Sequence, residues 1–254
     1  MPKFFVNEKQ IEDDKFFIVG EDVNHIKNVL RMKVGDTFFA CDDENSKNYL
    51  AEISNFEKDR INCKIIERMK DTAESNIKVH IFQGLPKSDK MELIIQKSVE
   101  LGAFKITPTE MKRCVVKLDV KDKAKKVYRW QKIAEVAAKQ SGRDIIPEVC
   151  SVKSLKDVLE ELKKFDLVLL CYENEKEIFL KDILNEAKRQ IDYNKDYNVA
   201  VIIGPEGGID VSEVEMLEDS KTRVISLGNR ILRTETVALS VLSIIMYEFE
   251  RNDI

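Results

Sequence analysis

The sequence contains few of the residues that cross-link a chain, bind metals or span a membrane. Its 254 residues include five cysteines, two histidines and one tryptophan. The cysteines are scattered and no C-x-x-C pair occurs, so we expect buried, reduced thiols and no metal site. No apolar run approaches the ~18 residues that a membrane span needs. The first residues lack a signal-peptide core. These absences predict a globular protein of the cytoplasm that has no membrane partner.

The charge of the chain is slightly negative but unevenly distributed. Lysine and arginine total 42 against 46 acidic residues, a formal net charge of −4, which argues against indiscriminate nucleic-acid binding. Residues 105–143 are nevertheless strongly basic. They include a charged loop and a predicted helix, Lys121–Gln140, with Trp130 on its apolar face. A basic helix face is usually only solvated, although a basic loop followed by a basic helix also suits a polyanion. The cations of this face are Lys125, Lys126, Arg129, Lys132 and Lys139.

The first part of the chain, residues 1–72, is predicted to form a small β-barrel. Short strand patterns recur at even spacing and are separated by turn residues. One helix is predicted over Asp22–Leu30, with Val23, Ile26, Val29 and Leu30 on a single face. The polar stretch Lys70–Asn76 is a predicted linker. The predicted strands are Lys3–Val6, Phe16–Val19, Thr37–Ala40, Tyr49–Phe56 and Arg60–Ile66.

The second part, residues 73–254, alternates strands and helices, which predicts an α/β domain with a mostly parallel sheet. It begins with the strand Ile77–Gly84 and the helix Lys90–Leu101, for which Ser88 or Asp89 is the expected N-cap. Ser154 is expected to cap another helix. The continuous apolar strand Phe165–Tyr172 is typical of a central parallel strand. It ends at Glu173, where ligand contacts are expected.

Two glycine-containing loops near the C-terminal end are the main functional signal. The strand Asn198–Ile203 leads into the loop Gly204–Gly208, and the strand Arg223–Leu227 leads into the loop Gly228–Arg233. A helix from Thr234 to about Arg251 follows, with Thr234 or Thr236 as its expected cap. Gly228 alone suits a tight turn. Three glycines within five residues favour a ligand site, because glycine allows close backbone approach. Neither the P-loop pattern nor G-x-G-x-x-G occurs.

The two loops resemble the signature loops of the SPOUT superfamily of methyltransferases. Ile203-Gly204-Pro205-Glu206-Gly207-Gly208 and the segment from Leu227 to Thr236, LGNRILRTET, carry the resemblance. More narrowly, the chain is similar to the ribosomal RNA small-subunit methyltransferase E family. This resemblance implies an N-terminal PUA-like barrel, a C-terminal trefoil knot and S-adenosylmethionine as methyl donor. It also implies methylation of N3 of a uridine in 16S rRNA of the small ribosomal subunit, and a homodimer.

The resemblance also assigns residues to the site. Arg233 and Glu206 are the catalytic candidates. Glu206 is a general base if burial raises its pKa, or a carboxylate that holds the second loop by hydrogen bonds. Arg233 stabilises a uracil anion or clamps an RNA phosphate. The cofactor-binding candidates are Leu170, Gly204, Glu206, Gly207, Leu227, Gly228, Ile231 and Leu232.

Five cations are candidate RNA contacts, although each could be an ordinary surface charge. Arg31 and Lys33 belong to the stretch from His25 to Asp36 that resembles the PUA-like segment. The others are Lys87, Arg113 and Arg143. Two other functions stay open: a ribose 2′-O-methyltransferase with the same two loops, and a non-catalytic RNA-binding or ribosome-assembly protein. The dense apolar pattern of Val237–Phe249 suits either a dimer interface or a plain core helix.

Overall fold

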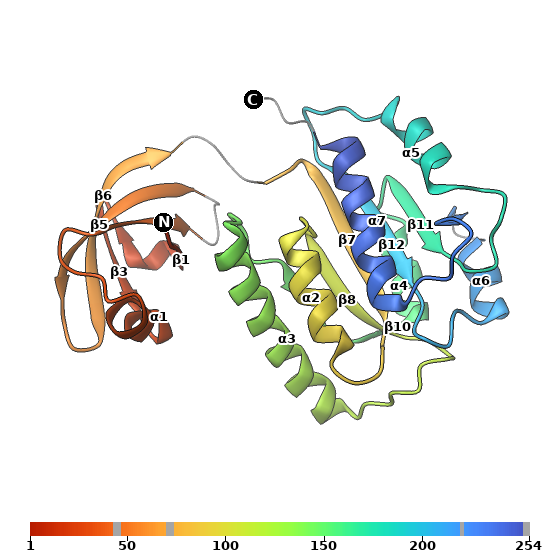
Figure 1. The fold of residues 1–254 in the computed structure, drawn as a ribbon, viewed down its shortest axis with the longest axis horizontal. Coiled ribbons are helices and arrows are strands. Elements are labelled where there is room, and N and C mark those ends of the chain that lie inside the picture. The colour runs from red at the N-terminus through yellow and green to blue at the C-terminus, as the bar shows by residue number, and fades with distance from the viewer. Residues whose placement is uncertain (43–46, 70–73, 219–220, 251–254) are drawn as a thin grey trace. The chain divides into compact units, whose positions relative to one another are not determined.

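The computed structural model describes residues 1–42, 47–69, 74–218 and 221–250, which divide into two compact units (Figure 1). The first unit comprises residues 1–74 and 138–146. The second comprises 75–137 and the chain from residue 147 onward. The predicted boundary between residues 72 and 73 lies outside the described residues, as do most of the predicted linker and the position of Arg251.

The first unit contains a six-stranded sheet with the order β1-β4-β5-β6-β3-β2. β1 runs parallel to β4, and the remaining neighbours are antiparallel. Alternating side chains on these strands bury a core centred on Phe38, which packs edge-on against Phe4 and Phe16. Closure of this sheet into a barrel stays a prediction. The elements are β1 (Lys3–Val6), η1 (Glu8–Gln10), β2 (Ile11–Glu12), β3 (Lys15–Val19), β4 (Thr37–Asp42), β5 (Asn48–Phe56) and β6 (Arg60–Met69).

The single helix predicted for this unit is irregular. α1 (Glu21–Asn24) continues as a π-helix, η2 (His25–Val29), in which the Leu30 N–H donates to the His25 carbonyl oxygen at 2.9 Å. Val23 and Ile26 are buried as expected, but Val29 is 62% exposed and Leu30 is also exposed. The prediction of one apolar face was wrong for these two residues. A π-turn contains an extra residue, so it rotates them away from the face that the 3.6-residue period assigns.

The second unit is an α/β domain with a parallel sheet, as predicted. Its strands lie in the order β10-β8-β7-β12-β11-β13, and β9 also pairs with β8. All of these pairs are parallel. Every residue of β11 is buried, as its continuous apolar sequence predicts. The strands are β7 (Ile77–Gly84), β8 (Lys105–Glu110), β9 (Glu148–Val149), β10 (Lys153–Ser154), β11 (Leu167–Cys171), β12 (Tyr197–Ile203) and β13 (Arg223–Ile225).

Six helices in the described chain belong wholly or largely to this unit. The C-terminal helix α7 packs beside α2 and contacts β7, β12 and α5 (Figure 1). Trp130 on α3 is buried, which confirms its predicted place in the core. None of the described helices is long and apolar enough to cross a membrane. The helices are α2 (Lys90–Glu100), α3 (Val120–Ser141), α4 (Leu155–Leu162), α5 (Leu180–Lys188), α6 (Val211–Glu218) and α7 (Thr234–Phe249).

The helix caps agree with the sequence only in part. Ser154 caps α4 with its hydroxyl, and Asp157 completes a capping box, as that motif predicts. Asp89 occupies the N-cap position of α2 without a side-chain hydrogen bond. Arg233 is the N-cap residue of α7, so the prediction that Thr234 or Thr236 caps this helix was wrong. The Thr234 hydroxyl is used instead to join α7 to the first glycine loop.

Candidate functional site

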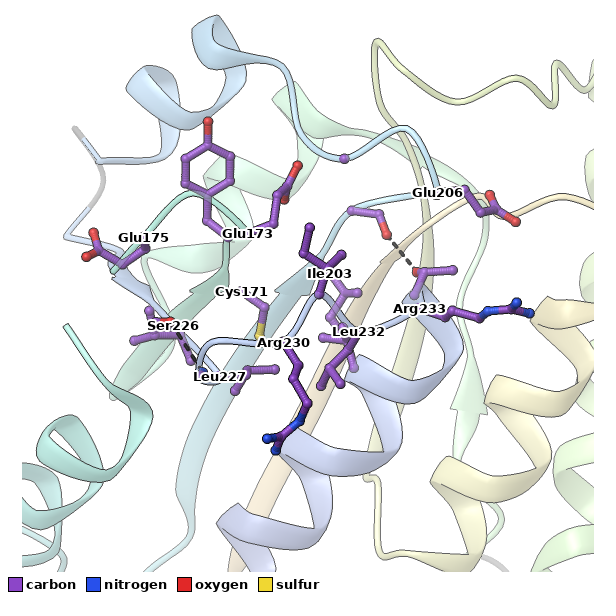
Figure 2. Close-up of a pocket in the computed structure, with 18 of the residues that line it drawn as sticks. Cys171, Glu173, Glu175, Ile203, Glu206, Ser226, Leu227, Arg230, Leu232 and Arg233 are labelled. Carbon is purple, nitrogen blue, oxygen red and sulfur yellow. Dashed lines mark hydrogen bonds between the residues drawn. The ribbon is translucent and has the colours of Figure 1, made fainter. Parts of the chain in front are cut away.

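The carboxyl ends of the parallel strands form one edge of the sheet, and a cavity of about 670 Å³ lies there (Figure 2). The two predicted glycine loops follow β12 and β13, and the chain after β11 supplies a third wall. Parallel strands bring their carboxyl ends together, which is why segments far apart in sequence meet here. We call this space the loop cavity. Its lining includes Lys90, the segment Cys171–Glu173, Glu175, Lys176, Ile203–Glu206, Gly208, the segment Ile225–Thr234 and Val237.

Close packing requires the glycines of the first loop. A Cβ on Gly204 would lie 2.7 Å from Cγ1 of Ile209. Gly208 has a φ of +71°, and a Cβ there would overlap a carboxylate oxygen of Glu173. In the second loop, Gly228 has a φ of +107° with no atom near its missing Cβ. The first loop therefore needs glycine for packing as well as conformation, whereas Gly228 needs it for conformation alone.

A buried amide on β7 connects the first glycine loop with the start of α7. Gln83, at the end of β7, is completely buried, and its Nε2 donates to Thr234 Oγ1 at 2.8 Å. The Thr234 hydroxyl in turn donates to the Gly204 carbonyl oxygen at 2.7 Å. β7, the first loop and the start of α7 are thereby held together. The sequence does not mark either residue as functional, because a glutamine and a threonine carry no distinctive chemical signal.

Glu206 belongs to an ion cluster at the rim of the cavity. Its carboxylate accepts the Lys87 N–H at 3.1 Å and lies 3.0 Å from Lys90 Nζ, which is also 3.3 Å from Glu235. Burial raises the pKa of Glu206, but hydrogen bonds from its own backbone, Lys90 and Lys87 outweigh that effect. The pKa therefore lies below its ordinary value. This direction favours the alternative of a structural carboxylate, and Glu206 holds the β7–α2 loop through the Lys87 N–H.

The floor of the cavity is apolar. The predicted cofactor contacts Leu227 and Leu232 contribute to the lining, together with Ile203 and Cys171 (Figure 2). Burial raises the pKa of the Cys171 thiol to about 12, so this side chain is neutral. The predicted contact Leu170 is fully buried and lies outside the lining, because successive side chains on a strand point to opposite faces.

The predicted residue Ile231 lines the cavity but is 86% exposed. Gly228, another predicted cofactor contact, also lines the cavity. Gly207 does not, because it faces Arg113, whose Nη1 donates to the Gly207 carbonyl oxygen at 3.3 Å.

Acidic side chains lie opposite Glu206, on the wall formed after β11 (Figure 2). Glu173, expected from the sequence as a contact at the end of this strand, lies against the first glycine loop. Glu175 accepts the backbone N–H groups of residues 176, 177 and 178, at 2.8, 2.7 and 3.1 Å. The hydrogen bonds from residues 177 and 178 lower the pKa of Glu175, so this carboxylate orders its loop as an anion.

Arg233 stands at the mouth of the cavity. It lines the cavity as the N-cap residue of α7 and is exposed. In Figure 2 its side chain and that of Glu206 extend toward the same side, whereas Arg230 points elsewhere. Thr234, Glu235 and their partners fix the backbone directly after Arg233. The Arg233 guanidinium therefore lies beside the cavity, and the backbone that carries it is held in place by these contacts.

Four of the five predicted RNA contacts are exposed cations. Lys87 and Arg113 lie in the second unit near the first glycine loop, and Arg113 is also 3.6 Å from Asp210. Arg31 and Lys33 are exposed in the first unit, where Arg31 has a left-handed φ of 54°.

The prediction that Arg143 contacts RNA was wrong. Its side chain is only 6% exposed, and its guanidinium forms two hydrogen bonds with the Glu74 carboxylate, at 2.8 and 2.6 Å. A guanidinium that is desolvated and bound bidentately in this way has no free edge for a phosphate. The sequence could not reveal this pairing, because the two residues are 69 positions apart.

Comparisons with known proteins agree with this architecture. A family described as RNA methyltransferase domain matches residues 73–246, and one described as RNA methyltransferase PUA domain matches residues 18–66. The chain is 40% identical over 253 residues to ribosomal RNA small subunit methyltransferase E of Bacillus subtilis, covering 98% of each protein. It is 34% identical over 244 residues to the same enzyme of Mesomycoplasma hyopneumoniae, covering 96% of this chain and 98% of the relative.

A solved structure is also similar over nearly the whole chain. The ribosomal RNA small subunit methyltransferase E from Neisseria gonorrhoeae, bound to S-adenosyl methionine, superposes with a TM-score of 0.82 at 28% identity. The match covers 97% of both chains. The two-part organisation, the parallel sheet with its paired glycine loops and these full-length matches lead to one conclusion. The chain belongs to the ribosomal RNA small subunit methyltransferase E family.

Proposed function

We propose that this protein transfers a methyl group from S-adenosylmethionine to N3 of a uridine in 16S rRNA. The observation that carries the proposal is the loop cavity, enclosed by the paired glycine loops with Arg233 at its mouth. Family membership supports RNA methylation. The choice of uridine N3 within 16S rRNA follows the resemblance of the two loops.

The residues of the cavity fit the methyl donor. Its volume of about 670 Å³ is within the range of small-molecule sites. Leu227, Leu232 and Ile203 offer an apolar surface suited to an adenine ring, and the exposed backbone of Gly228 allows close approach. Glu173 places a carboxylate near the first loop, where it can attract a positively charged ligand. When bound, S-adenosylmethionine supplies a methyl group that is activated by its sulfonium.

The task of the protein is then to orient the target and to stabilise charge on it. Uracil N3 lies on the Watson–Crick edge, so the target base must be unpaired to enter. The N3 proton passes to solvent water, which leaves negative charge on the ring and its carbonyl oxygens. Arg233 is the residue that can stabilise this charge, because it is exposed at the cavity mouth on a fixed backbone. Glu206 supports the geometry from the neighbouring ion cluster.

Four further parts of the proposal rest on the resemblance. The chain is expected to form a trefoil knot around the two glycine loops and to assemble as a homodimer. Arg31, Lys33, Lys87 and Arg113 are expected to contact RNA phosphates, since all four are exposed cations. We expect the small ribosomal subunit to be the partner of the enzyme.

The test is transfer of a labelled methyl group to small ribosomal subunits that lack the modification, followed by nucleoside analysis. A 3-methyluridine product supports the reaction, donor and substrate together. A 2′-O-methylated nucleoside, which nuclease digestion identifies because it protects the next linkage, would contradict the N3 assignment. No transfer and no S-adenosylmethionine binding by calorimetry would indicate a non-catalytic RNA-binding protein.

A further inference from the structure

The first half of α3 presents an exposed stripe that the loop cavity does not involve. Lys121, Lys125, Tyr128 and Lys132 follow one another at intervals of four, three and four residues, so they share one face of the helix. They lie on the side opposite Trp130, which is buried. We call these four residues the α3 stripe. It spans about 16 Å at the ~1.5 Å rise per residue of an α-helix.

Tyr128 is the unusual member of the stripe. Its side chain is 69% exposed in the middle of three lysines. A solvated helix face does not require an exposed aromatic ring. Proteins that bind single-stranded nucleic acids, in contrast, place aromatic rings among cations so that bases can stack on them. Bases in a duplex are already stacked, so the ring can only receive a base from an unpaired segment.

The positive charge of the α3 stripe is available to a partner. Several basic residues on the flanks of α3 are neutralised: Lys123 pairs with Glu110 at 2.7 Å, and Arg129 pairs with Glu92 at 2.8 Å. Lys132 lies 3.1 Å from Glu135 on the same helix. Among the described residues, Lys121 and Lys125 have no ion-pair partner, although the nearby Asp122 moderates their field. Two uncompensated lysines in a chain of net charge −4 mark a local site for an anion.

The position of the stripe connects it to the site. α3 follows β8 in a parallel sheet, so its N-terminal turns begin at the carboxyl edge. The loop cavity occupies the same edge. Lys121 and Lys125, in the first two turns, therefore lie at the end of α3 nearest that edge.

We propose that the α3 stripe binds an unpaired RNA segment next to the target nucleotide, with Lys121 and Lys125 on phosphates and Tyr128 stacked on a base. This proposal rests on the proposed function for its substrate, but it assigns a surface outside the loop cavity. It differs from the phosphate contacts expected at Arg31, Lys33, Lys87 and Arg113 because it includes a stacking interaction.

The first experiment measures binding of a short labelled oligouridine by fluorescence anisotropy at several salt concentrations. Lys121→Gln combined with Lys125→Gln should reduce the slope of log affinity against log salt by about 1.4, at ~0.7 per phosphate contact for single strands. The matched control combines Lys156→Gln on α4 with Lys181→Gln on α5, which are also exposed and unpaired within the described chain. Equal slopes for the two double variants would overturn the proposal.

The second experiment tests stacking. Tyr128→Ala should weaken oligouridine binding by roughly tenfold, whereas Tyr128→Phe, which keeps the ring, should bind like the wild type. Equal affinities for these two variants would overturn the role of the ring. Calorimetric binding of S-adenosylmethionine should be unchanged in every variant, which also shows that each one is folded. The wild type could fail to methylate small subunits while the variants still lose RNA binding as expected. That result would reject the proposed function but would support RNA binding by the α3 stripe.

Discussion

At the scale of single residues, one lysine connects the functional parts of the site. Lys90 Nζ lies 3.0 Å from Glu206 of the first loop and 3.3 Å from Glu235 in the first turn of α7. The hydrogen bond that Lys90 donates to Glu206 raises the pKa of Lys90, while contacts that include Lys90 lower the pKa of Glu206. Both groups are therefore charged at neutral pH. Lys90 thereby connects the first loop to the first turn of α7, which directly follows Arg233.

Replacement of Arg233 by alanine should sharply lower turnover and leave S-adenosylmethionine bound. Removal of a charge that acts on the developing anion should reduce kcat by about 10²- to 10³-fold. Single-turnover methyl transfer measures the loss, and calorimetry measures cofactor affinity. The matched control is Arg230→Ala, which removes another cavity-lining arginine that points elsewhere in Figure 2. Unchanged turnover in Arg233→Ala would reject its catalytic role.

The low pKa of Glu206 predicts that Glu206→Gln keeps most of its activity. A general base would lose about 10²- to 10⁴-fold, but a carboxylate that is held by hydrogen bonds should lose less than tenfold. Lys90→Met should cause a similar modest loss, because it breaks the same cluster, and Lys90→Arg should restore activity. The kcat and KM of the three variants are compared at neutral pH. A loss above about a hundredfold in Glu206→Gln alone would restore the base hypothesis.

The same shift determines the pH dependence of stability. A carboxyl group with a lowered folded-state pKa stabilises the protein above its ordinary pKa of 4.5. That contribution is lost as pH falls through the lower folded-state value. The stability difference between wild type and Glu206→Gln should therefore be present at neutral pH and shrink in acid, as thermal unfolding can measure.

At the scale of elements, the first glycine loop depends on its close fit with the chain after β11. Gly208→Ala should destabilise the loop, because alanine at φ +71° costs about 1–2 kcal/mol and its Cβ would overlap Glu173. We expect at least tenfold weaker S-adenosylmethionine binding by calorimetry. Gly20→Ala is the control, because Gly20 has a φ of +75° with no atom near its missing Cβ. Equal cofactor affinity in both variants would contradict the importance of the loop.

At the scale of the whole molecule, one face of α7 is left uncovered. Ile244 is 42% exposed and Tyr247 is 85% exposed, while Val241, Leu242 and Ile245 are buried. An exposed apolar pair on an otherwise buried helix suits the proposed dimer interface. The wild type should sediment as a dimer, and Ile244→Glu combined with Tyr247→Glu as a monomer. Val115→Glu, which replaces another exposed apolar residue, should stay dimeric. A monomeric wild type would reject the homodimer.

By itself, the sequence was sufficient to predict most of the longer strands and helices, the parallel second unit and the two glycine loops, but not the short strands β2, β9 and β10. These features depend on local periodicity, turn residues and short motifs, which act over a few positions. The prediction failed at Val29 and Leu30, where a π-helix changes the period, and at the cap of α7. Both failures come from local geometry that residue type does not specify.

The tertiary structure alone decided which residues share the site and which are neutralised. Arg143 forms an ion pair with Glu74, and Glu206 forms one with Lys90. In both pairs the partners come from segments far apart in the chain. Leu170 and Cys171 are adjacent in sequence, yet only Cys171 lines the cavity. Charge, exposure and pKa depend on the atoms that surround a group, and folding alone brings those atoms together.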